Sequence, residues 1–235
     1  LQHLKRLSVG KNQFKRIPKE IKHFSSLESL SIGGKIKNLS DSVMKLTSLK
    51  GLHLDDNHLT SIPQEIGKLT DLISLHVNDN RIETIPKEIG KNTKLLSLEI
   101  NGNELTDLPE EIGSLQELVY FNANHNRLIK LPESVGSLKN LEELFLRDNE
   151  LPSLPFSMEQ MKKLDKLDLR DNLLSEIPEH VLRLPSLRVV SWEGNKIKNK
   201  KDAARIMEER GFKQYEKGVY SIKQGLSMRP TILLI

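Results

Sequence analysis

The chain has 235 residues, of which 37% are hydrophobic and 29% are charged, an ordinary composition for a folded protein. It contains no cysteine, which excludes disulfide bonds, thiolate metal sites and a cysteine nucleophile. Its net charge of +4 is unevenly distributed, because residues 196–235 contain ten Lys or Arg and four Asp or Glu. The basic excess therefore gives little support to nucleic-acid binding by the rest of the chain.

A unit of 23 residues, LxxLxLxxNxLxxIPxxIGxLxx, recurs along residues 1–198. Its nine copies, of which the ninth is truncated, begin at Leu4, Leu27, Leu49, Leu72, Leu95, Leu118, Leu141, Leu164 and Leu187. The asparagine of the unit occurs at Asn12, Asn57, Asn80, Asn103, Asn126, Asn149, Asn172 and Asn195. The second copy, residues 27–48, has 22 residues and lacks both the asparagine and the proline. A repeat of this length predicts a solenoid, in which each unit buries its apolar side against its neighbours.

Each part of the unit predicts a different element. The LxL segment alternates apolar and polar residues, which is typical of a short strand with one buried face. We expect the asparagine to be buried where the chain leaves the strand and to hydrogen-bond the turn backbone. The proline fixes φ, and the spacing of the following IGxL predicts short 3₁₀, α or irregular segments on the return arm. Acidic residues before the asparagine are expected to bond backbone N–H groups; these are Asp56, Asp79, Asp148 and Asp171.

The repeat pattern ends after Asn195, and residues 199–235 are predicted to form a C-terminal cap on the last open core. Residues 200–211 have apolar side chains at helical spacing and end on a glycine, which predicts a helix. Residues 212–225 are predicted to form a hairpin. The apolar segment 228–235 is expected to pair with a sheet edge or to contact a partner. The expected regions are thus a repeat domain over 1–198 and a cap over 199–235.

The segments SIPQEIGKL, TIPKEIGKN, DLPEEIGSL and KLPESVGSL resemble the 23-residue LPxxIGxL type of the leucine-rich repeat superfamily. This type occurs in Ras-suppressor and Scribble-like scaffold proteins, in plant Ras-group-related proteins and in small secreted leptospiral proteins of spirochaetes. The Lys-, Asn- and Glu-rich composition and the lack of cysteine-rich flanks are most similar to the last group. The resemblance implies an α/β fold, a right-handed horseshoe with a parallel sheet on its concave face. It also implies a protein-binding role and no reaction.

Alternation along each strand is expected to place three columns of side chains on the concave face. The residues predicted to bind a partner there are His53, Asp55, His76, Asn78, Glu99, Asn101, Tyr120, Asn122, Asn124, Phe145, Arg147, Lys166, Asp168 and Arg170. Tyr120 and Phe145 lie one column apart on adjacent strands. We expect both to be exposed as anchors, with the basic residues nearby pairing acidic groups of the partner, because aromatics and arginine dominate binding hot spots. The alternative is that these are surface residues with no role in recognition.

His53, His76 and Glu99 occupy one column on three consecutive strands, which lie about 4.7–4.9 Å apart per step. Two imidazoles and a carboxylate at this spacing leave open a zinc site, or a metal-dependent hydrolase built on it. A solvated column that stabilises adjacent strands is the favoured alternative, because a flat sheet usually lacks the outer residues that orient metal ligands. No cofactor is therefore expected.

The predicted function is non-enzymatic recognition of a protein partner across the concave face. A secreted or surface protein of a bacterium that recognises a host surface protein is the favoured version, and a cytoplasmic signalling scaffold is the alternative. We favour a monomer, with a purely structural or self-associating solenoid as the alternative, and we expect no nucleic-acid partner. We expect no transmembrane segment, because no apolar run approaches the roughly 18 residues that a spanning helix needs. The ubiquitin-ligase chemistry of some bacterial repeat proteins is excluded because it needs a cysteine nucleophile.

Overall fold

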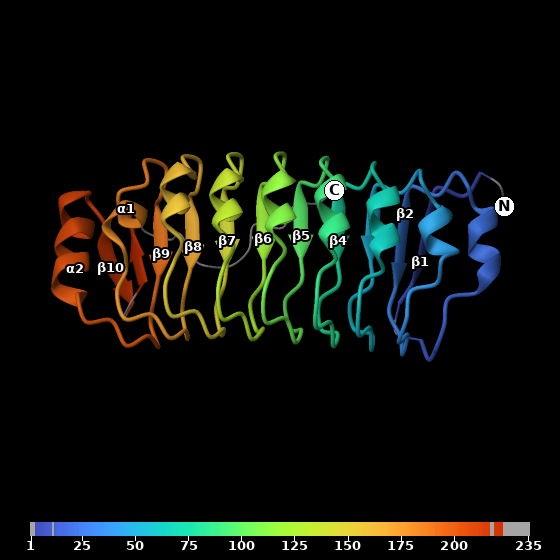
Figure 1. The fold of residues 1–235 in the computed structure, drawn as a ribbon, viewed down its shortest axis with the longest axis horizontal. Coiled ribbons are helices and arrows are strands. Elements are labelled where there is room, and N and C mark those ends of the chain that lie inside the picture. The colour runs from blue at the N-terminus through green and yellow to red at the C-terminus, as the bar shows by residue number, and fades with distance from the viewer. Residues whose placement is uncertain (1–2, 11, 217–218, 223–235) are drawn as a thin grey trace.

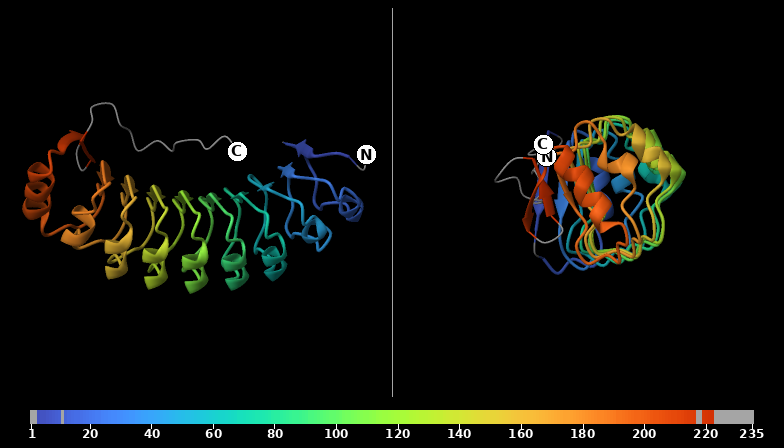
Figure 2. Two further views of the ribbon diagram at one scale, coloured as in Figure 1. Left: turned by 90° about the horizontal axis from the view of Figure 1, so that it is seen from above. Right: turned by 90° about the vertical axis from the view of Figure 1, so that its left-hand side faces the viewer.

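The computed structural model describes residues 3–10, 12–216 and 219–222. In this part of the chain, nine short strands run parallel and in chain order along one face (Figure 1). They are β1 (Arg6–Val9), β2 (Ser29–Ile32), β3 (Gly51–His53), β4 (Ser74–His76), β5 (Ser97–Glu99), β6 (Tyr120–Asn122), β7 (Glu143–Phe145), β8 (Lys166–Asp168) and β9 (Val189–Ser191). Figure 2 (left) shows the strands on the inner side of an arc and the helices on its outer side. The predicted fold class is confirmed.

Short helices form the outer side of the arc. They are η1 (Lys19–His23), η2 (Val43–Lys45), η3 (Gln64–Lys68), η4 (Lys87–Lys91), η5 (Glu110–Ser114), η6 (Glu133–Ser137) and η7 (Phe156–Gln160), all of the 3₁₀ type, followed by the α-helical turn α1 (Glu179–Leu182). A proline precedes each of them except η2, which belongs to the irregular second repeat. Adjacent turns pack so closely that a Cβ on Gly90 would lie 2.8 Å from the carbonyl oxygen of Glu111. This close approach explains the glycine of the IG pair.

The template leucines form one continuous core between the sheet and the helices. Leu52, Leu75 and Leu98 lie side by side on β3, β4 and β5, each at most 1% exposed. Trp192 replaces a core leucine in the last repeat and is 5% exposed, as expected from its position in the unit. Burial of this aliphatic stack is the main driving force for the fold, because the aromatic content is only 4%.

The template asparagines from Asn57 onward, buried except for the half-buried Asn195, join each repeat to the one before it. In Asn103, Oδ1 accepts a hydrogen bond from the backbone N–H of Ile82 at 3.0 Å. Its Nδ2 donates to the carbonyl oxygens of Val77 and Ile100, both at 3.0 Å, and of Asn101 at 3.2 Å. The same four kinds of bond recur at Asn57, Asn80, Asn126, Asn149, Asn172 and Asn195. The predicted role of the asparagine is confirmed.

The second repeat has a glycine pair, Gly33 and Gly34, in its turn and lacks the template asparagine. Asn12 has no counterpart in that repeat, and its Oδ1 accepts a hydrogen bond from Phe14 N–H in its own repeat at 2.7 Å. A Cβ on Gly34 would lie 3.0 Å from Asn12 Oδ1 and 3.1 Å from the Phe14 carbonyl oxygen. Glycine therefore allows the two turns to approach.

A helix and a hairpin cover the C-terminal end of the core. Helix α2 (Lys200–Glu209) buries Ala203, Ile206 and Met207, and β11 (Val219–Ser221) pairs antiparallel with β9 and with β10 (Lys213–Glu216). The Arg210 guanidinium donates to the carbonyl oxygen of Leu184 at 2.7 Å and also to that of Leu182. The predicted helix and hairpin are thus present, and the division into two domains stays a prediction. The apolar segment 228–235 lies outside the described residues.

Replacing Asn103 with leucine is expected to lower the free energy of unfolding by about 3 kcal/mol, because it leaves buried backbone groups without partners. Asn92→Leu is the matched control. Asn92 is fully buried at a position where most other repeats have leucine, and its Oδ1 has no partner among the described residues. The carbonyl oxygens that it bonds also accept backbone N–H groups. This second change is expected to alter stability by less than about 1 kcal/mol. Urea unfolding measures both, and equal losses would contradict the role given to the asparagine.

Candidate functional site

The concave face carries the three predicted columns because the parallel strands pair without a shift. His53 lies opposite His76, His76 opposite Glu99, and Asn122 opposite Phe145. Nine of the predicted partner-binding residues are half-buried on this face: His53, Asp55, His76, Asn78, Glu99, Asn101, Asn124, Arg147 and Arg170. The other five are buried: Tyr120, Asn122, Phe145, Lys166 and Asp168. The face therefore divides into a more open N-terminal half and a more enclosed C-terminal half.

Two stacked imidazoles mark the N-terminal half. The His53 and His76 rings are nearly parallel, with centroids 4.2 Å apart and an interplanar angle of 10°. His53 Nε2 lies 2.9 Å from Ser74 Oγ, and His76 Nε2 lies 3.3 Å from Ser97 Oγ. Both serines are buried, so the hydrogen bonds fix the rings in an upright stack.

Both imidazoles resist protonation. Burial and, to a smaller extent, repulsion from the adjacent His76 together lower the pKa of His53 to about 4. Burial also lowers the pKa of His76 to about 4. The stack is therefore neutral at pH 7 and does not balance the nearby carboxylates.

The His/Glu column does not converge on a metal-binding point in this arrangement. The two parallel rings aim their Nε2 atoms at serine hydroxyls, and Glu99 Oε1 lies 3.6 Å from His76 Nε2. A search of the described residues finds no group of three or more His, Asp or Glu side chains placed to hold a metal ion. The geometry thus gives no support to zinc at His53, His76 and Glu99, or to a hydrolase built on it.

Carboxylates surround the stack without matching cations. Asp55 Oδ1 accepts a hydrogen bond from the Asn78 backbone N–H at 2.7 Å, and Glu99 Oε2 accepts one from Asn78 Nδ2 at 3.0 Å. Burial raises the pKa of Asp55 to about 6, with smaller contributions from the negative charges of Glu99, Asp56 and Asp79. Partial burial, together with repulsion from Asp56, also raises the pKa of Asp79. This half of the face holds excess negative charge.

The expectation that Tyr120 and Phe145 are exposed is wrong. Tyr120 is 3% exposed and Phe145 is 1% exposed. Their rings contact each other, with centroids 5.5 Å apart, and this contact contributes to their burial. Burial also raises the pKa of the Tyr120 hydroxyl. Neither ring is available to anchor a partner in this structure.

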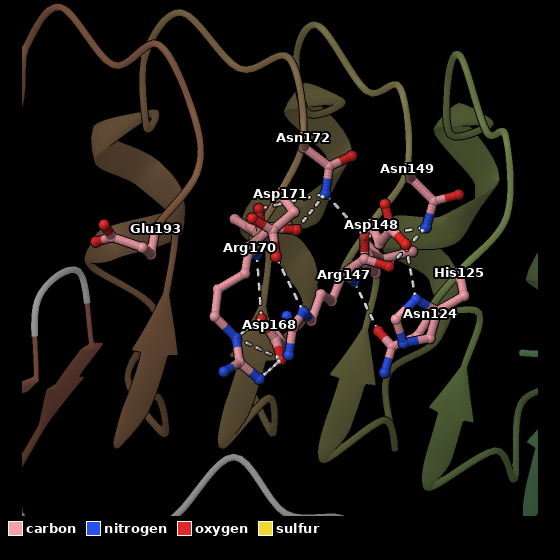
Figure 3. A network of polar contacts seen from close by, with 12 residues as sticks. Asn124, His125, Arg147, Asp148, Asn149, Asp168, Arg170, Asp171, Asn172 and Glu193 are labelled. Carbon is pink, nitrogen blue, oxygen red and sulfur yellow. Dashed lines mark hydrogen bonds and ion pairs between the residues drawn. The ribbon is translucent and has the colours of Figure 1, made fainter.

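The basic residues of the C-terminal half pair with carboxylates of the same chain. Lys166 Nζ lies 2.9 Å from Glu143 Oε1, and both side chains are buried. Arg170 Nε donates to Asp168 Oδ1 at 2.9 Å, and Arg147 Nε donates to Asp171 Oδ2 at 3.0 Å (Figure 3). Arg147, Lys166 and Arg170 thus each have a carboxylate neighbour within the chain, and their pairing with acidic groups of a partner stays a prediction.

The acidic turn residues adopt a left-handed conformation at one edge of the concave face. Asp56, Asp79, Asp148 and Asp171 all have φ between 53° and 55°. Asp148 accepts a hydrogen bond from His125 Nδ1 at 2.8 Å, and Asp171 pairs with Arg147 (Figure 3). Among the described residues, none of these four carboxylates accepts the expected hydrogen bond from a backbone N–H group, and Asp148 and Asp171 bond side chains of neighbouring repeats instead.

Two features of the site escaped the sequence analysis. Ser74 and Ser97 hold the imidazole stack, and Glu143 pairs with Lys166 across adjacent strands. Both pairings could have been predicted from the column positions, because each partner lies on the next strand in the same or the neighbouring column.

The chain belongs to the leucine-rich repeat family. The family described as "Leucine-rich repeat region" matches residues 1–79, 44–118 and 83–209, which together span most of the chain. No curated protein matches the chain. No helix among the described residues combines the length and the apolar character needed to cross a membrane.

Solved structures show the same solenoid. The chain is 36% identical to the LRR protein LIC12759 of Leptospira interrogans, over 82% of this chain and 49% of that one, with a TM-score of 0.78. It is 32% identical to the plant peptide hormone receptor RGFR1, solved in complex with RGF2, over 83% and 33% of the two chains, with a TM-score of 0.72. An internalin of Listeria monocytogenes shares the fold at 23% identity and a TM-score of 0.61, over 81% and 62% of the two chains. The chain thus spans about half of LIC12759 and a third of RGFR1.

Removing the Glu99 charge is expected to lower two pKa values together. In Glu99→Gln, Asp55 loses a like charge and ionises more easily, while His53 loses an opposite charge and protonates less easily. NMR titration of the Asp55 carboxyl carbon and the His53 ring protons measures both changes. Glu117→Gln removes one charge from an exposed position that neither group contacts and is expected to leave both values unchanged. An unchanged Asp55 pKa in the Glu99 variant would contradict the electrostatic description.

Proposed function

We propose that the chain is a non-enzymatic recognition module that binds a protein partner across its concave face. The observation that carries the proposal is the composition of β3–β5, where non-repeating polar side chains stand half-buried on a rigid sheet. Hydrogen bonds already order these side chains, so association would cost little conformational entropy. The similar receptor RGFR1 is a peptide hormone receptor, which supports a binding role for the shared fold.

The partner-binding residues proposed here shift toward the N-terminal half. His53, Asp55, His76, Asn78 and Glu99 remain accessible on the concave face, whereas the aromatic pair is buried. The C-terminal charges are proposed to shape the face through their internal ion pairs instead of contacting the partner first. Recognition would therefore depend on repeats three to five.

Opposite faces of the fifth repeat provide a matched test. The chain is immobilised to capture proteins from a cell-surface extract, and each captured protein is measured against two variants. Asn101→Arg places a bulky cation on the concave face, whereas Ser114→Arg places the same side chain on exposed η5. A partner is expected to bind Ser114→Arg normally and Asn101→Arg at least tenfold more weakly, a loss of about 1.4 kcal/mol. Equal binding to both variants, or loss only on the outer side, would overturn the proposal.

We further propose that the chain is secreted or displayed at a bacterial surface and recognises a host protein. Its similarity to a Leptospira interrogans protein supports a bacterial origin, and a cytoplasmic scaffold is the alternative. Protease added to intact source cells is expected to degrade the protein while a cytoplasmic marker survives. Survival of the protein until the cells are lysed would favour the scaffold.

A further inference from the structure

A hollow of about 390 Å³ opens on the concave face over β1–β3. It exists because the third column contains glycine in the first two repeats, Gly10 and Gly33, where later repeats have larger side chains. Gly34 of the shortened second repeat also lines it. The volume lies at the lower end of the range for ligand pockets and suits one long side chain with its backbone.

One wall of the hollow is acidic. Asp55 and Asp56 both line it. The hydrogen bond from Asn78 uses Oδ1 of Asp55, and among the described residues the other oxygen has no hydrogen-bond partner. The backbone of Asp56 is in the left-handed conformation, and its side chain is exposed. Two carboxylates thus border one space.

On the side of the hollow formed by β3–β5, the sheet supplies no lysine or arginine to balance them. The strand-and-turn segments 51–57, 74–80 and 97–103 contain Asp55, Asp56, Asp79 and Glu99 and no lysine or arginine. Within the described part of the chain, none of the four carboxylates forms an ion pair with a lysine or arginine. This differs from the C-terminal half, where Glu143, Asp168 and Asp171 each pair with a basic side chain. Among the described residues, these carboxylates therefore remain without a lysine or arginine partner from the chain itself.

His53 adds a flat surface to the hollow. One face of its ring stacks on His76, toward β4. The residue opposite His53 on the other neighbouring strand is Ser31 of β2, which is small and lines the hollow together with His53. The second face of the imidazole therefore lies on the side of Ser31 and the hollow.

We propose that this hollow seats an arginine side chain of the protein partner. Its planar guanidinium would stack on the second face of the His53 ring and donate hydrogen bonds to Asp55 and Asp56. A guanidinium suits the site better than an ammonium, because it is weakly hydrated, stacks on flat rings and matches carboxylates with paired donors. The inference rests on the proposed function, which supplies the partner, and adds the chemistry of one contact.

The test uses the purified full chain and small probes, so it needs no partner. Backbone amides of Gly33 and Gly34 are followed by NMR while N-acetyl-arginine-N-methylamide is added up to tens of millimolar, a range that detects weak single-side-chain binding. The citrulline derivative has nearly the same shape without the charge, and the lysine derivative has the charge without the plane. We expect saturable shifts with arginine, binding at least threefold weaker with lysine, and none with citrulline.

Two variants probe the wall and the volume separately. Asp55→Asn keeps an oxygen that can accept the hydrogen bond from Asn78. It is expected to weaken binding of the arginine probe at least fivefold. Gly10→Leu fills the hollow, since a Cβ at that position meets no atom within 4 Å, and is expected to abolish the shifts. Asp107→Asn, an equal charge change at an exposed position outside the hollow, is expected to have no effect. Circular dichroism checks that each variant is folded.

The proposal is overturned by equal binding of the arginine and citrulline derivatives, by no saturable shift with arginine, or by tighter binding of lysine. It is also overturned if folded Gly10→Leu binds the arginine probe as well as the natural chain. These results would not affect the proposed function if the captured partner still binds Asn101→Arg more weakly than the natural chain. Conversely, the hollow could bind the arginine probe while every captured partner still binds Asn101→Arg normally. This result would show that the hollow is a binding site but would overturn the proposed recognition face.

Discussion

The whole arrangement depends on hydrogen bonds that no repeat can complete alone. Each buried asparagine serves carbonyl groups of two repeats and one N–H group of the preceding turn, as Asn103 does with Val77 and Ile82. Leaving such groups unpaired in the core would cost more than the bonds themselves contribute. The asparagines therefore set the spacing and register of the coils. Register in turn lines up the concave columns, so residues 23 positions apart can act on one another.

The fold could be predicted because it depends on the regular spacing of a few residue types. Leucine, asparagine and proline return at fixed intervals, and each has one structural role wherever it occurs. Accessibility is different, because it depends on contacts between residues that the period does not specify. Tyr120 and Phe145 were placed on the correct face, yet their mutual contact and near-complete burial do not follow from alternation along a strand. Periodicity predicts the direction of a side chain and not what covers it.

The same limit applies to charge. Column positions indicated that acidic and basic residues share the concave face, but they did not reveal that the C-terminal charges are matched within the chain and that those of repeats three to five are not. A charge that is already paired contributes to shape, whereas an unpaired one contributes to long-range attraction. The neutral imidazole stack strengthens the contrast, since at pH 7 it leaves the nearby carboxylates uncompensated.

The antiparallel pairing of β11 with β9 gives the solenoid a terminus of a different kind from its interior. A further coil of the 23-residue type continues this pattern only beside a parallel neighbour, because the backbone groups of each strand and turn bond those of the parallel strand next to it. An antiparallel pair spaces and orients its hydrogen bonds differently from a parallel pair. A coil added by repeat duplication therefore continues the parallel ladder of β1–β9 only where it enters upstream of that reversal.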